Sequence, residues 1–422
     1  MDVVDTGTTA FMLCCIIGLT LMIPGLALFY GGMVSVKSST NMMMMTFGAV
    51  AIVGVLWVLF GFSMTFGTSM GGFVGSITEF FGMKDLLESQ TTISGLPVSL
   101  FALFQALFAA ITVALISGAA ADRMKFAAWM VFATAWAVLV YFPVAHWVFA
   151  FNGVVTPDAV GGWIANNLKA IDFAGGTAVH INAGAAALAV AIVLGKSASW
   201  GQLRKPHNVP LTLLGAGLLW AGWYAFNGGS ALAAGNSAAI VMVTTFVATC
   251  AATLAWLAVE KFKDGHVTGV GAAAGAITGL VAITPACGSV TPVGAIILGL
   301  IAGAICPFAV GMKEKFGYDD SLDVVGVHLV GGVIGTLLIG FLASDSMPNK
   351  TNGLFYGGGF DQLWRQAVAA GAVLAYSFVV AFIIAFAIKK TMGLRVAPED
   401  EESGIDAKLH RDAAYELTST SL

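Results

Sequence analysis

Charge is scarce in this sequence. Of 422 residues only 10% are charged, whereas 58% are hydrophobic and the mean hydropathy is +0.89. Ordinary soluble domains carry about 25% charge, so the composition excludes a cytosolic enzyme. It also excludes disorder, which requires low hydrophobicity and high net charge. A formal net charge of −4 provides no basic surface for nucleic acid. We therefore expect a chain that lies in a lipid bilayer.

Regularly spaced cysteines are also lacking. The five cysteines are odd in number and do not follow the spacing of a disulfide framework or a zinc site. The run from Met42 to Met45 resembles a soft-metal cluster, but four consecutive residues of a helix point to different faces. We expect neither a metal nor a cofactor.

Long apolar windows make up most of the chain. Nine windows of at least twenty residues contain no Asp, Glu, Lys or Arg, and two of them, 206–259 and 265–312, are long enough for two spans each. A membrane-spanning helix needs about 20 apolar residues. The sequence thus predicts an all-α polytopic membrane protein with eleven spans. These lie near 8–31, 41–62, 97–119, 126–149, 176–195, 209–229, 236–259, 268–285, 291–312, 325–344 and 364–390.

The basic residues predict the orientation. With the N-terminus outside and the C-terminus inside, fifteen Lys and Arg fall on inner loops and the tail, and four fall outside. The four are Lys84, Lys169, Lys350 and Arg365. This bias matches the positive-inside rule. No basic residue precedes Lys37, as a secretory signal would require, so we expect the first span to be retained.

Short motifs recur in two halves of the chain. Both the first and the sixth span end in Phe-x-Gly-Gly, and the fifth and tenth spans each carry a histidine after valine, His180 and His328. Because each half has five spans, the second half enters the membrane from the opposite side, as in the inverted repeats of transporters. We expect a transporter domain over 1–392, with half-repeats at about 8–195 and 209–344, an extra helix at about 364–390, and a cytoplasmic tail over 393–422.

The two deep histidines are the first candidates for function. Ionisable residues at this depth are usually functional, and the repeat would bring His180 and His328 together near the midplane. Two alternatives remain: a neutral imidazole that only bridges two helices, and bis-histidine haem ligation. Three acids lie beside these spans, Asp172 before the fifth and Asp320 and Asp323 before the tenth. For all three, we favour capping of a helix start over proton shuttling.

These residues resemble the Amt/Mep/Rh ammonium transporter family, bacterial Amt type. The resemblance covers nearly the whole chain and rests on long motifs in a fixed order. They are "IPGLALFYGG" (23–32), "FQALFAA" (104–110), "SGAAADRMKF" (117–126), "DFAGGTAVHINAG" (172–184), "GWYAFNGGSA" (222–231), "DDSLDVVGVHLVGG" (319–332) and "GLRVAPEDEESGID" (393–406). The resemblance implies an eleven-helix bundle with an inverted five-plus-five repeat, a homotrimer with one pore per subunit, and no enzymatic activity.

The resemblance also implies roles for individual residues. Phe108 and Ser230 would recruit the cation, Phe226 would close the pore below them, and Phe29 and Trp223 would line the pore towards the twin histidines. Asp172 would hold the vestibule and the helix start in shape, and Asp320 and Asp323 would lie at the other helix start near the pore. The family usually has tryptophan at the position of Phe149 here, so the outer aromatic cage would be Phe108 with Phe149, a weaker cation–π partner than tryptophan. Trp147 could substitute only if the helix were rotated.

The implied substrate is ammonium, with methylammonium as an analogue. We expect recruitment of the ion, loss of its proton and passage of ammonia past neutral histidines, in a multi-pass protein of the cell membrane. The acidic tail, with Glu399 to Glu402 and Asp406, resembles the family tail beside which a PII-type signal protein docks. The alternative function is an ammonium sensor on the same fold that signals through its cytoplasmic face.

Overall fold

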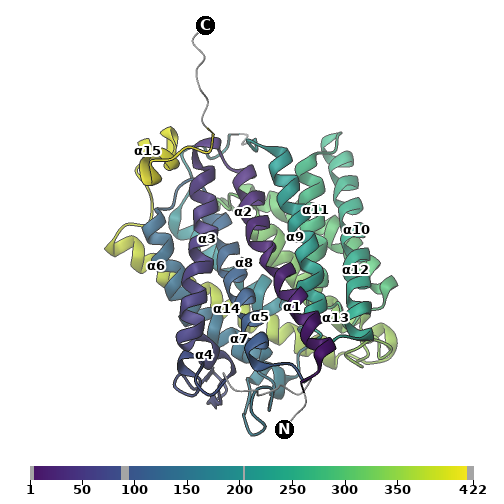
Figure 1. Cartoon of the computed structure of the whole chain (residues 1–422). Helices are drawn as coiled ribbons and strands as arrows, with labels where there is room; N and C mark the ends of the chain where they lie inside the picture. The colour runs from purple at the N-terminus through teal and green to yellow at the C-terminus, as the bar shows by residue number, and fades with distance from the viewer. Residues whose placement is uncertain (1–3, 87–94, 203–204, 416–422) are drawn as a thin grey trace.

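The computed structural model shows a bundle of long helices that run roughly side by side (Figure 1). It describes residues 4–86, 95–202 and 205–415, so Arg204 and the last seven residues of the expected tail lie outside the described part. The start of α1 and the short tail helix α15 lie at opposite ends of the bundle. Large apolar side chains such as Ile17, Leu254 and Ile383 are exposed on its periphery, as a surface in contact with lipid requires.

The α-helices and strands have the following bounds. The helices are α1 (Thr6–Thr20), α2 (Met22–Met33), α3 (Ser39–Leu56), α4 (Phe62–Phe66), α5 (Val98–Ile116), α6 (Phe126–Trp136), α7 (Phe142–Phe149), α8 (Asn182–Leu194), α9 (Val209–Gly229), α10 (Asn236–Asp264), α11 (Gly269–Ile283), α12 (Pro292–Phe316), α13 (Val330–Leu342), α14 (Asp361–Thr391) and α15 (Pro398–Ser403). Strands β1 (Ser69–Met70) and β2 (Val74–Gly75) form a small antiparallel hairpin that the sequence analysis does not predict.

Ten of the eleven predicted spans correspond to helical runs long and apolar enough to cross a membrane. The eighth predicted span, 268–285, contains a shorter helix, α11, of 15 residues. Residues 284–290, which follow α11, are buried but not helical. Non-helical backbone at membrane depth is tolerated where protein covers it, so the short helix is compatible with a crossing at this position.

Several spans contain a π-helical turn, in which the backbone hydrogen bonds skip one more residue than in an α-helix. These turns are η2 (Trp57–Gly61), η5 (Ala137–Tyr141), η7 (Gly176–Ile181) and η8 (Val325–Leu329). Such turns are rare and often lie at functional sites. Here η7 carries His180 and η8 carries His328.

Glycine allows helices to pack closely. A Cβ atom added to Gly299 or Gly303 of α12 would lie 2.3 Å from the backbone oxygen of Ala248 or Ala252 on α10. Small residues at helix interfaces let backbones approach in this way in membranes, where the hydrophobic effect does not drive helices together. The high glycine content therefore contributes directly to the packing of α10 against α12.

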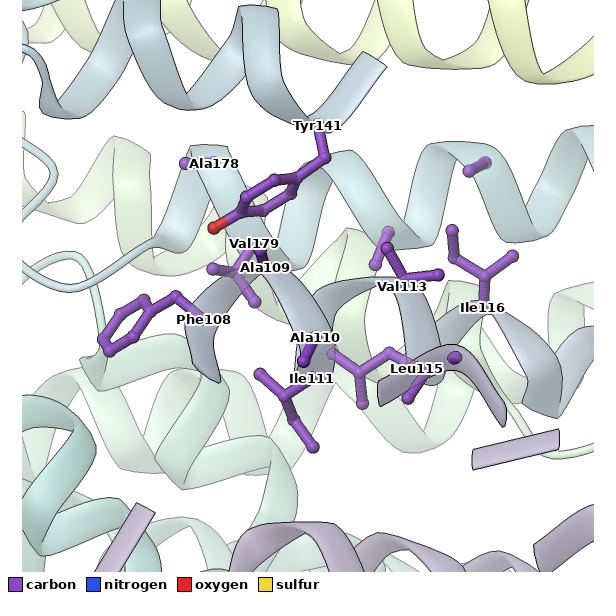
Figure 2. Close-up of a cluster of buried hydrophobic side chains, with 14 of the residues drawn as sticks. Phe108, Ala109, Ala110, Ile111, Val113, Leu115, Ile116, Tyr141, Ala178 and Val179 are labelled. Atoms are coloured by element: carbon purple, nitrogen blue, oxygen red, sulfur yellow. The ribbon is translucent and has the colours of Figure 1, made fainter. Parts of the chain in front are cut away.

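Helix α5 lies in the interior of the bundle. Figure 2 shows Phe108, Ile111 and Leu115 of α5 in one buried cluster with Tyr141 of η5 and Val179 of η7. All five side chains are buried. This packing fixes the part of α5 that reaches the candidate pore.

The tail folds back onto the bundle. The buried carboxylate of Asp406 accepts backbone hydrogen bonds from Thr40, at 2.9 Å, and from Asn41, at 2.7 Å, in the first turn of α3. Ser38, which precedes α3, provides no side-chain cap. Asp406 thus supplies the acceptor that an N-cap residue usually provides.

Candidate functional site

A vestibule opens at one end of the central helices. This cavity, of about 360 Å³, is lined by Phe108, Phe149, Asp172 and Ser230, among others. The rings of Phe108 and Phe149 meet edge to face, with centroids 6.2 Å apart. Aromatic faces attract cations, so two rings and a hydroxyl in one cavity form a surface suited to a small cation.

The structure distinguishes between the two aromatic candidates on α7. Phe149 lines the vestibule, whereas Trp147 packs against Trp163 and Tyr376. The indole nitrogen of Trp147 donates a hydrogen bond of 2.7 Å to the carbonyl of Phe73. Trp147 is therefore engaged in the helix packing, and Phe149 is the partner of Phe108.

Ser230 directly follows α9, and its hydroxyl oxygen can still accept a hydrogen bond from a ligand. Its Oγ donates a hydrogen bond of 2.8 Å to the backbone oxygen of Phe226, one turn earlier. A hydroxyl has two acceptor lone pairs besides its donor. With its proton committed to the helix, Ser230 is oriented to accept a hydrogen bond from a donor in the vestibule.

Two stacked rings separate the vestibule from a second cavity. Phe108 and Phe226 lie nearly parallel, 15° apart, with centroids at 4.0 Å. Both line a cavity: Phe108 the vestibule, and Phe226 a narrow space of about 10 Å³ deeper in the bundle. A space of that size holds about one water-sized molecule. The stacked pair therefore joins the lining of one cavity to the lining of the other.

The deeper cavity brings together five residues that the sequence analysis assigns to the pore. Its walls include Phe29, Trp223, Phe226, His180 and His328, and the rest of its lining is almost wholly apolar. The Nδ1 atoms of the two histidines lie 3.2 Å apart, within hydrogen-bonding distance. The ring of Trp223 stacks on His180 at 5.5 Å. The structure thus joins two histidines that are 148 residues apart in the chain.

One polar atom of the histidine pair has no hydrogen-bond partner in the described part of the chain. Nε2 of His180 is buried without a hydrogen-bond partner among the described residues. A buried polar atom without a partner is unfavourable unless water or a ligand satisfies it. A small molecule able to form hydrogen bonds would satisfy this atom.

Asp172 holds the start of the fifth span. Its carboxylate accepts hydrogen bonds from the backbone nitrogens of Gly175, Gly176, Thr177 and Ala178, at 2.6–3.1 Å, and one from the Thr177 hydroxyl. Four donors of one helix start are satisfied by a single side chain, which is the capping predicted from the sequence.

The two acids before the tenth span differ from each other. Asp320 is buried and accepts a hydrogen bond of 2.7 Å from the Val325 nitrogen at the start of η8, as a cap does. Burial first, and then the Asp323 carboxylate, raise the pKa of Asp320 from 3.8 to about 7. Asp323, by contrast, forms an ion pair of 2.5 Å with Lys313. The prediction that Asp323 also caps the helix is therefore wrong, because a lysine of α12 engages its carboxylate.

Comparison with known proteins identifies the family. The model of the Ammonium Transporter Family matches residues 10–415. The chain belongs to this ammonium transporter family. An ammonium transporter of Mycobacterium tuberculosis is 52% identical, and the alignment covers 100% of this chain and 92% of that protein.

Two solved structures have the same fold as this chain. Mep2 of Saccharomyces cerevisiae matches with a TM-score of 0.85 and 32% identity, over 94% of this chain and 88% of Mep2. A structure titled "Sensor Amt Protein" matches with a TM-score of 0.87 and 29% identity, over 95% and 97% of the two chains. Ten helices among the described residues are long and apolar enough to cross a membrane, so this member of the ammonium transporter family is a multi-pass membrane protein.

Two residues of this site were not predicted from the sequence, Thr284 and Tyr30. Thr284 accepts a hydrogen bond of 2.8 Å from the Trp223 indole and so orients that ring. Tyr30 lines the histidine cavity, and its hydroxyl donates a 3.0 Å bond to Leu115. Thr284 lies in an apolar stretch with no distinguishing signal, whereas the position of Tyr30 next to Phe29 in "LFYGG" is a signal that could have indicated it.

Proposed function

We propose that this protein recruits ammonium in the vestibule, removes its proton and conducts ammonia past the paired histidines. The observation that carries the proposal is the pair of cavities on either side of the Phe108–Phe226 stack. The outer cavity offers two rings and a hydroxyl, and the inner one is narrow, apolar and contains two histidines. The first suits a cation, and the second suits a small neutral molecule.

The energetics support a change of charge between the two cavities. An aromatic face stabilises a cation by about 0.5–2 kcal/mol, whereas a charge at the centre of a bilayer costs at least about 2.5–3.5 kcal/mol. The vestibule can therefore concentrate ammonium but cannot compensate for its passage as an ion. Neutral ammonia avoids most of this cost. Potassium has no proton to release, which accounts for selectivity.

The histidine geometry supports a neutral pore. A hydrogen bond between two Nδ1 atoms requires that one ring donate a proton and the other accept it. The accepting ring lacks a proton at Nδ1 and is therefore neutral, so the pair cannot carry two positive charges. Ammonia both donates and accepts hydrogen bonds and can serve as the missing partner of the His180 Nε2 atom.

The proposed function also implies an arrangement of the whole chain in the membrane. We infer eleven spans, with α11 as the shortest, an N-terminus outside and a C-terminus inside, and an inverted repeat of 8–195 and 209–344 that pairs the two histidines. The resemblance supports a homotrimer, a transporter domain over 1–392 and a regulatory tail over 393–422. It also supports a PII-type protein at the inner face. Pull-down with and without 2-oxoglutarate tests that partner.

Liposomes test the central claim. We expect the reconstituted protein to give a current or uptake with ammonium and with labelled methylammonium, but not with potassium. His180→Ala and His328→Ala are each expected to reduce uptake or to admit potassium, because either change enlarges the cavity and breaks the pair. Wild-type transport and selectivity in both variants would remove the histidines from the mechanism.

The second candidate is an ammonium sensor. Likeness to the structure titled "Sensor Amt Protein" is the observation in its favour. A sensor binds ammonium without appreciable flux. Binding measured by calorimetry, together with no uptake in the same liposomes, would favour the sensor over the transporter.

A further inference from the structure

Lys169 has an uncommon backbone conformation at the vestibule. It follows the π-helical turn η6 (Ile164–Leu168) and has φ 57° and ψ 38°, in the left-handed region. Among residues with a side chain, mainly Asn and Asp adopt this conformation readily, and lysine does so rarely. A residue held in an uncommon conformation is a reason to look for a function.

The surrounding backbone fixes the position of Lys169. The nitrogen of Ala170 donates to the carbonyl of Ile164 at 3.3 Å. The next residue, Ile171, is held on both sides of its peptide by Gln366 of α14, at 2.7 Å each. The Cα atom of Lys169 is therefore anchored three residues before Asp172, and only the side chain is left to move.

Lys169 is the basic residue of the vestibule lining. Of the described residues that line this cavity, Lys169 and Asp172 are the charged ones. The Asp172 carboxylate is occupied by donors of the helix start. The exposed Lys169 ammonium group has neither an ion pair nor a hydrogen bond among the described residues. A basic residue with an unpaired side chain thus lines the cavity where a cation is to be recruited.

We propose that Lys169 sets the affinity of the vestibule for ammonium, as a tethered alkylammonium group that competes with the incoming ion. The inference rests on the proposed function. The lysine head group has the same charge and the same hydrogen-bond donors as methylammonium. It shares one cavity with Phe108, Phe149 and Ser230. Each substrate ion must therefore bind against the repulsion of a like charge.

Half-saturating ammonium concentrations test this role. Wild type and Lys169→Gln are compared in liposomes at about 0.01 M and about 1 M sodium chloride, where the screening length falls from about 30 Å to about 3 Å. We expect Lys169→Gln to lower the half-saturating concentration about fivefold at low salt, the effect of two unit charges about 4 Å apart in water. At high salt, the difference should disappear, which a purely structural role would not produce.

Two variants serve as controls. Lys169→Arg keeps the charge and should behave as wild type. Lys350→Gln removes an exposed lysine that has the same left-handed conformation, φ 48°, but does not line the vestibule, and it too should behave as wild type. An unchanged half-saturating concentration in Lys169→Gln at low salt, or a change in Lys169→Arg equal to that in Lys169→Gln, would overturn the inference.

Calorimetry separates this inference from the proposed function. Binding of methylammonium to the purified protein reports the affinity of the vestibule even if no flux is seen. Tighter binding by Lys169→Gln without transport would retain the role of Lys169 and reject conduction. Transport together with equal methylammonium binding by wild type and Lys169→Gln would retain conduction and reject the role of Lys169.

Discussion

At the scale of single residues, Asp172 has five hydrogen bonds to lose. Asp172→Asn keeps the size of the side chain but removes the charge that accepts five hydrogen bonds. Hydrogen bonds to a charged group contribute about 1.5–3 kcal/mol each to stability, so we expect a lower thermal unfolding midpoint in detergent and reduced methylammonium uptake. Asp158→Asn, which changes an exposed acid, should alter neither. Equal midpoints for Asp172→Asn and wild type would contradict this.

The raised pKa of Asp320 predicts that the stability of the folded protein depends on pH. Because its pKa is raised to about 7 in the folded protein, the folded state retains a proton that the unfolded chain loses above pH 3.8. The resulting stabilisation is complete at low pH and is lost as the pH rises to about 7. Asp320→Asn stays neutral at every pH and can still accept the Val325 hydrogen bond. Relative to wild type, its unfolding midpoint should therefore rise between pH 5 and pH 8.

The control for this prediction is Asp264→Asn, which changes an exposed acid at the end of α10. The difference between this variant and wild type should not vary over the same pH range. A constant difference between Asp320→Asn and wild type from pH 5 to pH 8 would show that burial does not shift this carboxyl group.

The sequence predicts which residues belong to the candidate site, but it does not predict the distances and contacts between them. Repeat logic alone predicts that His180 and His328 meet, and the structure brings their Nδ1 atoms to 3.2 Å. The roles of Phe108, Phe149, Ser230, Phe226, Trp223 and Phe29 came from the family motifs and stay predictions. No sequence pattern indicates that Thr284 orients Trp223, because a threonine in a predicted apolar span usually bonds to its own backbone.

At the scale of the helices, α12 offers a matched pair of glycines. In Gly299→Ala the new methyl group would lie 2.3 Å from the backbone oxygen of Ala248, whereas Gly311 has no atom within 4 Å of the same position. We expect Gly299→Ala to lower the unfolding midpoint by separating α12 from α10. Gly311→Ala should leave it unchanged or raise it, since alanine favours a helix by about 1 kcal/mol over glycine. Equal midpoints for the two variants would contradict the close approach.

The helices show which physical signals a sequence carries. Windows without charged residues predict the spans, because burial of a charge in lipid is costly. Ten of the spans predicted in this way correspond to long apolar helices. The same signal does not reveal where the helix itself stops. Residues 284–290 carry no charge either, although Pro285, Gly288 and Ser289 are residues typical of a turn. No sequence pattern predicts the π-helical turns η7 and η8 either.

For the molecule as a whole, the orientation is open to a direct test. Green fluorescent protein fused to the C-terminus should fluoresce, because it folds in the cytoplasm, and alkaline phosphatase fused there should be inactive. The same phosphatase inserted after Lys350, in a predicted outer loop, should be active. This pattern follows from the fifteen basic residues on predicted inner segments and the four outside. The reverse activities would invert the topology.

The proposed trimer predicts a definite mass. Native mass spectrometry from mild detergent should give a species of three chains of 43.5 kDa each, with no dependence on dilution over a wide range. A dominant single chain at all concentrations would reject the trimer without affecting the pore within each subunit.

The contact of Asp406 with the start of α3 also has a consequence for biosynthesis. Thr40 and Asp406 are 366 residues apart in the chain. At about 5–20 residues per second, the ribosome needs about 20–70 s to reach the second after making the first. Throughout that time α3 lacks this acceptor for its first backbone donors. A section of the chain that is synthesised much later thus completes one of the first helices.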